Sequence, residues 1–304
     1  MRTKKTTFAS LHLQAGFSLL EMVIVLAILT IVLASIFGGV NSAVQRSQAE
    51  QVKVDLVQEG REFIDEFERD VHQAGYPNCR MVAVTGTTFN CPADVNNLVE
   101  EKSSTVAAGL VYLSNTKVVF EGDVDGDGAV DSVQYALVDS ALNDPPTGSC
   151  PCSIRRSQIH KVDGTIPTAQ NPVATTVWTQ ELQNVVNSGQ PSSGNAYGNG
   201  LSISGSTSWG QTNNAYYASL STFKDYPVFQ AYNQYGGLID LSTALTIDNA
   251  TNSLILNCAP TSNNCVKTIR ITINLLGDAT TGVDLQTHTR PVTTLIGDAR
   301  LVNN

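Results

Sequence analysis

The sequence is poor in charge, in histidine and in cysteine. Charged residues make up 15% of the 304 residues, against about a quarter in an average globular protein. Since 42% of the residues are hydrophobic, a charge-rich disordered chain is excluded. The 18 basic residues are outnumbered by 27 acidic ones, and the net charge of -9 argues against a nucleic-acid partner bound through a broad basic face. Six cysteines are too few for a miniprotein built on disulfides.

Catalytic signatures are also missing. With four histidines and no HExxH pattern, the sequence leaves little room for a zinc hydrolase. It contains no GxSxG, no Walker loop and no GxGxxG that opens a helix after a strand. Paired acids such as Asp65/Glu66 and Glu68/Asp70 fall on an amphipathic helix, where a solvated face explains them. We therefore expect no enzyme and assign no catalytic residue.

A long apolar run lies close to the N-terminus. Residues 22–45 are 24 positions without a charge, and about 20 helical residues suffice to cross the hydrocarbon core of a membrane. Arg2, Lys4 and Lys5 precede the run, so the positive-inside rule keeps this end cytoplasmic and places the rest of the chain outside. The alternatives are a buried helix of a soluble protein and a cleaved secretory signal, although no convincing Ala-x-Ala-like site lies near residues 40–45.

One acidic residue stands at the start of this run. A carboxylate such as Glu21 inside a membrane span is unfavourable by roughly 2.5–3.5 kcal/mol, so it needs a partner. If the chain is cut between Gly16 and Phe17, the new amine of Phe17 can neutralise Glu21 of this chain or of a neighbour. The pattern Gly-Phe-Ser-x-x-Glu followed by an apolar helix resembles the type IV prepilin signature, over about residues 16–40.

This resemblance implies processing followed by assembly. A prepilin peptidase would cut between Gly16 and Phe17, and the Phe17 amine would be methylated. The mature helix would then polymerise with other pilin subunits, with Glu21 pairing with the N-terminus of a neighbour. Residues 1–16 would be the leader and residues 17–45 the transmembrane and assembly helix. The subunit would wait in the lipid of the inner membrane as a single-pass protein, until the inner-membrane pilus assembly machinery moved it into an extracellular filament.

Beyond the span, the pattern stays helical and becomes amphipathic over residues 46–75. The apolar stripe consists of Val52, Leu56, Phe63, Phe67, Val71 and Ala74. Gly75 and Pro77 predict the end of the helix. We thus expect one helix over residues 17–74 whose second half packs against a head. Gly38-Gly39 is a weak point, explained either by close helix packing or by a flexible joint.

The remainder, residues 76–304, predicts a β-rich extracellular head. Its clearest strand is VKTIRITINLL at 266–276, where apolar and polar residues alternate as on a half-buried antiparallel strand. Residues 188–219 are rich in Gly, Ser and Asn and predict an exposed loop. The expected fold class is α+β, a long N-terminal helix packed on an antiparallel head of the type IV pilin kind. Candidate strands are 81–85, 106–113, 116–120, 132–138, 153–162, 226–233, 254–257, 266–276 and 290–302.

Two short segments resemble one group of pilins. ERDVHQAGYPNC at 68–79 and ARLVNN at 299–304 are similar to the end of the first helix and to the closing strand of the PilW-like minor pilins. The resemblance implies a minor pilin that joins a type IV pilus in an initiation, tip or accessory role. One alternative is a minor pseudopilin of a type II secretion system, which shares the N-terminal signature. Others are a surface adhesin subunit and an anchored exported enzyme.

All six cysteines follow the span, which fits an oxidising exterior. They are Cys79, Cys91, Cys150, Cys152, Cys258 and Cys265. Six cysteines allow 15 pairings, and short loops make Cys79–Cys91 and Cys258–Cys265 the first candidates. Cys150 and Cys152 are too close in sequence for an easy bridge, and neither a zinc spacing nor a CxxC motif accompanies them.

An acidic loop, FEGDVDGDGAVDSVQY at residues 120–135, predicts a structural calcium site. Its four aspartates fall on positions 1, 3, 5 and 9 of an EF-hand-like loop, and Gly128 falls on position 6, where a sharp turn is needed. Position 12 is Gln134 instead of the usual Glu, and the flanks look like strands. A metal-free hairpin turn is the alternative, because Asp-Gly favours such turns. The predicted ligands are Asp123, Asp125, Asp127, the Ala129 carbonyl and Asp131.

Overall fold

The computed structural model describes residues 18–78, 81, 104–139, 141–146, 152–162, 177–187, 226–246, 265–277 and 292–302. This part of the chain contains a helix, α1 (Leu19–Gln73), and a ten-stranded sheet. The strands are β1 (Leu110–Leu113), β2 (Lys117–Gly122), β3 (Asp131–Val138), β4 (Cys152–His160), β5 (Trp178–Val185), β6 (Phe229–Asn233), β7 (Leu238–Ile239), β8 (Leu245–Thr246), β9 (Val266–Leu276) and β10 (Val292–Arg300). The chain divides into two compact units, Met1–Gln48 and Ala49–Asn304.

The first unit contains the apolar part of α1. By length and composition this helix can cross a membrane, and none of the residues in its most apolar stretch is buried. The helix continues without a break through Gly38 and Gly39. No atom lies within 4 Å of where a Cβ of either residue would stand, so packing within this unit does not account for the two glycines.

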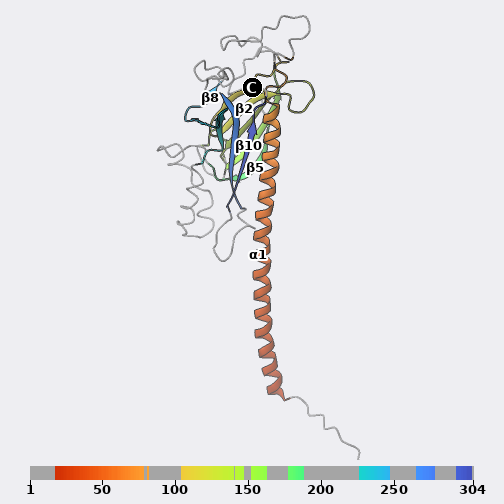
Figure 1. The fold of residues 1–304 in the computed structure, drawn as a ribbon. Helices are drawn as coiled ribbons and strands as arrows, with labels where there is room; N and C mark the ends of the chain where they lie inside the picture. Colours follow the sequence, from red (N-terminus) through yellow and green to blue (C-terminus); the bar gives the residue numbers. More distant parts are fainter. Residues whose placement is uncertain are drawn as a thin grey trace, which may run out of the picture. The chain divides into compact units, whose positions relative to one another are not determined.

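In the second unit, the rest of α1 buries one face against the sheet (Figure 1). The predicted stripe is confirmed: its buried members are Leu56, Phe63, Phe67, Val71 and Ala74, and Val52 is partly buried. Burying a large apolar side chain stabilises a fold by about 1.5–3 kcal/mol. The helix ends where the sequence predicts, with Gly75 in a left-handed conformation (φ 78°) directly after its last turn.

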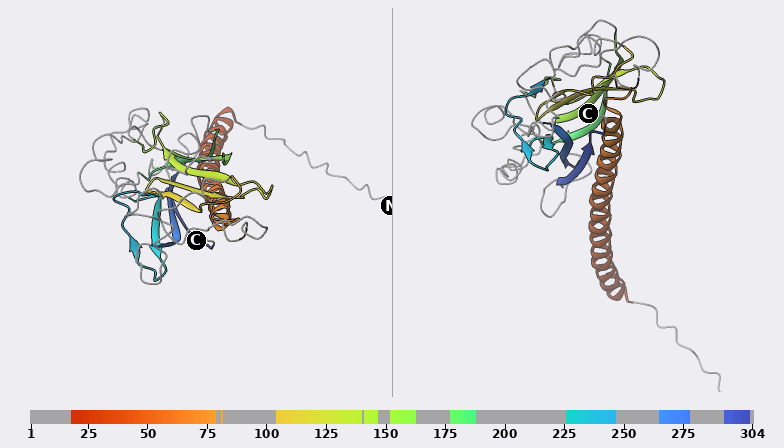
Figure 2. Two further views of the ribbon diagram at one scale, coloured as in Figure 1. Left: turned by 90° about the horizontal axis from the view of Figure 1, so that it is seen from above. Right: turned by 45° about the horizontal axis from the view of Figure 1, so that its top comes forward.

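The sheet is antiparallel throughout, in the order β7-β6-β9-β5-β4-β3-β2-β1-β8, with β10 paired to β9. Strands β1 to β5 form a meander in which each strand pairs with the next one in the chain. Figure 2 shows two groups of strands beside the helix: the meander, coloured yellow to green, and the β6–β9–β10 group, coloured cyan to blue. All eight residues of β3 are buried, which places β3 at the centre of the core.

Strand β9 joins these two groups. Ile271 pairs with Gly297 of β10 on one edge and with Phe229 of β6 on the other. Further along the same strand, Leu275 pairs with Val185 of β5. Between these pairings, the fully buried Asn187 completes the ladder with its side chain. Its Nδ2 donates to the Thr272 carbonyl at 3.0 Å, and its Oδ1 accepts from the Asn274 amide at 2.6 Å.

A buried polar cluster fixes α1 to the sheet, so the expectation of a solvated face is wrong for Asp70. The Asp70 carboxylate, which is 1% exposed, accepts hydrogen bonds from the Tyr135 hydroxyl at 2.7 Å and from Arg156 Nη2 and Nε at 2.8 and 2.9 Å. Burial, followed by the charge of Asp70, raises the pKa of Tyr135, so its hydroxyl stays protonated and donates. Tyr135 also packs edge-on against Phe63 and Phe67. This cluster and the aromatic contacts fix both the position and the rotation of the helix.

The helix lies close against two strands of the sheet at Gly60. A Cβ at this position would overlap the Leu295 Cδ1 atom of β10 and would lie 3.1 Å from Leu275 Cδ1 of β9. Glycine in mid-helix is less favourable than alanine by about 1 kcal/mol. The close contact with two strands gives the physical reason for this glycine, which the sequence pattern alone does not reveal.

The predicted fold class is confirmed: a long apolar N-terminal helix precedes an antiparallel, sheet-rich domain. Strand β5 was not among the expected strands, because a bulge with Asn184 at φ 57° places its buried residues Leu182 and Val185 three positions apart and hides the alternation. The short strands β7 and β8 also escaped prediction. Strand β9 alternates only in its first half, since Thr272 and Asn274 are buried as well. Most of 81–85, all of 254–257 and the 188–219 loop lie outside the described residues.

Candidate functional site

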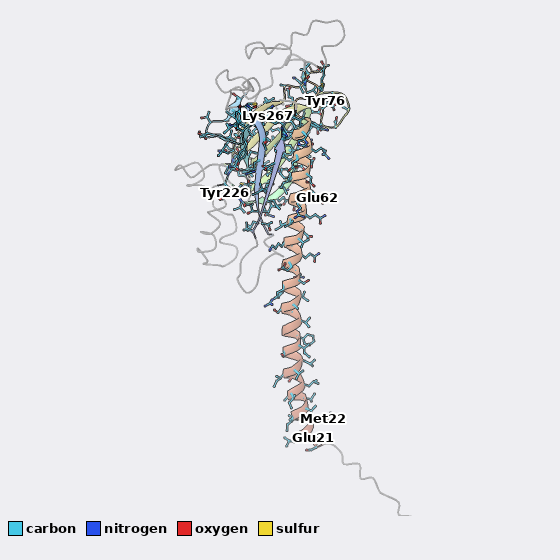
Figure 3. All side chains as sticks on the ribbon, in the orientation of Figure 1. Glu21, Met22, Glu62, Tyr76, Tyr226 and Lys267 are labelled. Atoms are coloured by element: carbon cyan, nitrogen blue, oxygen red, sulfur yellow. The ribbon has the colours of Figure 1, made fainter. Side chains whose placement is uncertain are left out.

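The predicted processing and assembly residues lie at the start of α1. Gly16 and Phe17 are outside the described residues. The helix begins at Leu19, with its first hydrogen bond from the Met22 amide to the Ser18 carbonyl at 3.1 Å. Glu21 is exposed in the first turn of α1 (Figure 3). A carboxylate is favourable there, because the first turn of a helix carries partial positive charge from unpaired amides.

The surroundings of Glu21 are otherwise apolar. From Leu19 to Val44 the large hydrophobic side chains of α1 are all exposed. In a membrane or in a bundle of such helices, these side chains have suitable partners and the Glu21 carboxylate does not. The chemistry that suits Glu21 is a nearby cationic amine, which would neutralise it where water is absent.

The aspartate loop is the second candidate site, and it connects β2 with β3. Its glycines Gly126 and Gly128 have φ of 77° and 89°, so the chain turns sharply at both. Ligand atoms of Asp123, Asp125 and Asp127 lie within 4.8 Å of one another. The loop is folded by its own carboxylates: the two Asp123 oxygens accept from the amides of Gly126 and Gly128 at 2.8 and 3.2 Å.

The other two predicted ligands of this loop, Ala129 and Asp131, follow Asp127 toward and into β3. Ala129 donates its amide to Asp127 Oδ1 at 2.8 Å. Asp131 opens β3, and its side chain is 1% exposed, facing β4. Gln158 Nε2 donates both to Asp131 Oδ2 at 2.8 Å and to Asp125 Oδ2 at 3.2 Å. Burial, and secondly the charge of Asp125, raise the pKa of the Asp131 carboxyl.

The base of the loop is tied to the end of α1. The Asp123 amide donates to the Tyr76 carbonyl at 2.8 Å, and the Gly75 amide donates to the Glu121 carbonyl at 2.8 Å. Beside them, Lys161 Nζ and Glu121 Oε2 form a buried ion pair at 2.6 Å, with exposures of 2% and 1%. Burial raises the pKa of Glu121, and the charge of Lys161 opposes this shift. The loop is therefore anchored to the helix end through β2 and the segment after α1.

Sequence reasoning missed Gln158, His160 and Lys161 as neighbours of the loop. They lie at the end of β4, antiparallel to β3, and His160 pairs directly with Asp131 in the ladder. Only the pairing of β3 with β4 brings them there. The two-residue periodicity of a strand could have predicted part of this, because it places Arg156, Gln158 and His160 on the same face of β4.

The structure describes two of the six cysteines. Cys152 and Cys265 are both buried and both disulfide-bonded. Cys79, Cys91, Cys150 and Cys258 lie outside the described residues. The pairing of the cysteines, including Cys79–Cys91 and Cys258–Cys265, therefore stays a prediction.

Comparison with known proteins identifies the N-terminal segment. Residues 11–37 match the prokaryotic N-terminal methylation motif, which contains Gly16, Phe17 and Glu21 and covers the start of α1. No curated protein and no solved structure matches the chain. The motif marks structural pilin-type proteins, not an enzyme family, and it implies processing by a prepilin peptidase and assembly with other pilins. With the apolar helix that begins inside it, the motif gives this chain the N-terminal segment of a type IV prepilin-like protein.

Proposed function

We propose that this protein is a minor pilin, which enters a type IV pilus in an initiation, tip or accessory role after cleavage by the prepilin peptidase. The observation that carries the proposal is the methylation motif at residues 11–37, within which a long, exposed apolar helix begins. A helix of this kind in a folded protein needs a lipid or protein environment. In this proposal lipid surrounds the helix before assembly, and neighbouring subunits surround it afterwards.

Assembly would proceed without covalent chemistry between subunits. Cleavage after Gly16 removes the basic leader and frees the amine of Phe17, which is then methylated and keeps its positive charge. Glu21 of one subunit pairs with the amine of its neighbour, and this neutralises both charges in an apolar filament core. The inner-membrane assembly machinery draws the helix out of the bilayer, and the sheet-rich head is displayed outside.

The size of the head favours a minor subunit over a major one. Residues 76–304 form more than two thirds of the chain, and in the pilins that this chain resembles a head of this size is typical of a minor subunit. The resemblance of 68–79 and 299–304 to PilW-like minor pilins points the same way. A minor pseudopilin of a type II secretion system shares the motif and the architecture, and it is the second candidate. An adhesive role of the head is compatible with either.

The first experiment is the intact mass and N-terminal sequence of the protein recovered from its native membrane or from sheared filaments. We expect a chain that begins at Phe17 and is heavier by one methyl group, about 14 Da. A chain that still begins at Met1, or one that is cut beyond residue 35, would overturn the proposal, since the apolar helix would then be an ordinary anchor or signal.

A second experiment separates the two kinds of filament. A deletion strain is complemented with the wild-type chain, with Glu21→Gln, or with Glu62→Gln as a matched control, because Glu62 is an exposed glutamate further along α1 (Figure 3). We expect wild type and Glu62→Gln to restore surface pili and Glu21→Gln to fail. Restored protein secretion with unchanged piliation would instead identify a pseudopilin.

A further inference from the structure

The β2–β3 loop places the carboxylates of three aspartates at one point. Asp123, Asp125 and Asp127 have ligand atoms within 4.8 Å of one another, and Asp125 and Asp127 are exposed to solvent. Like charges at this distance repel each other. Such a group also occurs on metal-free turns, so it becomes a site only if a further group points to a ligand.

That further group is Asp131. Its side chain is 1% exposed, and its Oδ1 atom is buried without a hydrogen-bond donor. The nearest group is His160 Nδ1 at 2.9 Å, on a ring that is 65% exposed. It can donate to Oδ1 only in the Nδ1–H tautomer or as the imidazolium, and the Nε2–H tautomer leaves Oδ1 without a donor. Asp131 faces the group of three, because its Oδ2 shares the Gln158 Nε2 donor with Asp125 Oδ2. A buried carboxylate oxygen that lacks a donor is normally satisfied by water or by a cation.

The geometry points to a calcium ion bound in this loop, coordinated directly by Asp123, Asp125 and Asp127, and through water by Asp131. The choice of metal follows from the donors. Carboxylate oxygens with a backbone carbonyl in a turn suit Ca²⁺, which takes six to eight oxygens in flexible geometry, and position 9 of such loops often acts through water. The Ala129 carbonyl stands at position 7 of the spacing, where the backbone provides a ligand.

The ion would have a structural role. The Asp123 amide is bound to the Tyr76 carbonyl, and the adjoining strand holds the Gly75 amide. Ordering the loop therefore also orders the end of α1, the segment after it and, through Gln158, strand β4. This inference concerns the head alone and does not depend on whether the chain joins a pilus or a pseudopilus.

The test uses the full chain in detergent, freed of metal with EDTA. Calcium binding is measured by calorimetry, and Tm is compared in EDTA, CaCl₂ and MgCl₂. We expect one calcium ion per chain with Kd of about 10⁻³ M or tighter. At tenfold excess over Kd, Tm should rise by about 3–6 °C with calcium and by less with magnesium.

The decisive variant is Asp125→Asn/Asp127→Asn, which changes two exposed residues and should stay folded. We expect at least tenfold weaker calcium binding and no calcium-dependent rise in Tm. The matched control is Asp240→Asn, since Asp240 is also an exposed turn aspartate that accepts a nearby amide, that of Ser242. It should bind calcium like wild type. The inference is overturned if no heat and no Tm shift appear up to about 10 mM calcium, if the double variant binds as tightly as wild type, or if magnesium stabilises equally.

Discussion

The two stretches of α1 bury their apolar side chains in different places. In the first unit, the apolar residues of the helix are exposed, and Phe37 is 68% exposed. In the second unit, Phe67 is completely buried against Tyr135 and Phe229. One continuous helix therefore carries a surface that none of the described residues covers and a surface that packs against the chain's own sheet. Substitutions in the first stretch should affect membrane insertion and assembly, and substitutions in the second should affect folding.

The acidic residues of α1 differ in the same way. Asp70 is buried and its charge is neutralised by Arg156 of β4, with Tyr135 of β3 as a second donor. Glu21 is exposed in its own unit, within an apolar stretch. The sheet provides the counter-charge of Asp70, whereas a neighbouring subunit would provide that of Glu21. Four predictions follow, and three of them compare matched substitutions in the two stretches. Stability is measured on the full chain in detergent.

The largest difference is expected between the phenylalanines. Phe67→Ala removes a fully buried ring and leaves a cavity, so the free energy of unfolding of the head should fall by about 3–5 kcal/mol. Phe37→Ala should change it by less than about 0.5 kcal/mol, because an exposed side chain contributes little to the fold. Urea denaturation, followed by circular dichroism of the sheet, measures both. Equal losses in the two variants would contradict the division of the helix into two stretches.

The next effect concerns the buried acid. Asp70→Asn leaves the Arg156 guanidinium with only the more distant Glu66 carboxylate, at 3.8 Å, and the head should lose about 3 kcal/mol. Asp55→Asn, on the exposed face of the same helix, is the control and should stay within about 0.5 kcal/mol of wild type. Glu21→Gln should leave the unfolding of the head unchanged while abolishing assembly. A head destabilised by Glu21→Gln would show that this residue serves folding.

A smaller effect is expected for the helix glycines. Gly60→Ala forces a Cβ against Leu295 and Leu275, which is unfavourable by about 1–3 kcal/mol, although alanine recovers about 1 kcal/mol of helix propensity. The net loss in thermal denaturation should be about 1 kcal/mol. Gly39→Ala meets open space, and the stability of the head should not change. A more stable Gly60→Ala head would mean that Leu295 rearranges without loss.

The smallest expected effect is a gain in stability of the head, caused by Glu66→Gln. Burial, and then the charge of Glu181, raise the pKa of Glu66, while Arg156 opposes the shift. The folded chain thus holds this proton more tightly than the unfolded chain, and its stability falls as pH rises from the ordinary value of 4.5 through the raised one. Since a third of the side chain is exposed, Glu66→Gln should stabilise the head by at most about 0.5 kcal/mol at pH 7. It should also flatten the pH dependence.

The control for this prediction is the stability of wild type and Glu66→Gln at acidic pH. Below pH 4, where the wild-type carboxyl is protonated in both states, the two chains should be equally stable. A Glu66→Gln chain that is less stable than wild type at pH 7 would show that the contact with Arg156 at 3.8 Å outweighs both the burial of the carboxylate and the repulsion by Glu181.

Much of the chain was predictable because the signals are local. The helix, its apolar stripe and its end near Gly75 follow from spacing and from residue type. Strands β2, β3, β4, β6, β9 and β10 follow from runs of β-branched and aromatic residues. Strand β5 did not, because the bulge at Asn184 interrupts its alternation. The end of β9 also differs from expectation, since Thr272 and Asn274 are buried there and their backbone groups bond the side chain of a residue as distant in sequence as Asn187.

The sequence by itself determined the properties that are read along a linear chain. A peptidase, a bilayer and a metal ion each recognise a short segment, so Gly16, Phe17, Glu21 and the spacing of the aspartates are visible without a fold. The tertiary structure decided which partners neutralise the buried charges. Tyr135 and Arg156 reach Asp70 across 65 and 86 residues, and Lys161 reaches Glu121 across 40. No local pattern specifies these pairs, because strand order and register alone bring them within bonding distance.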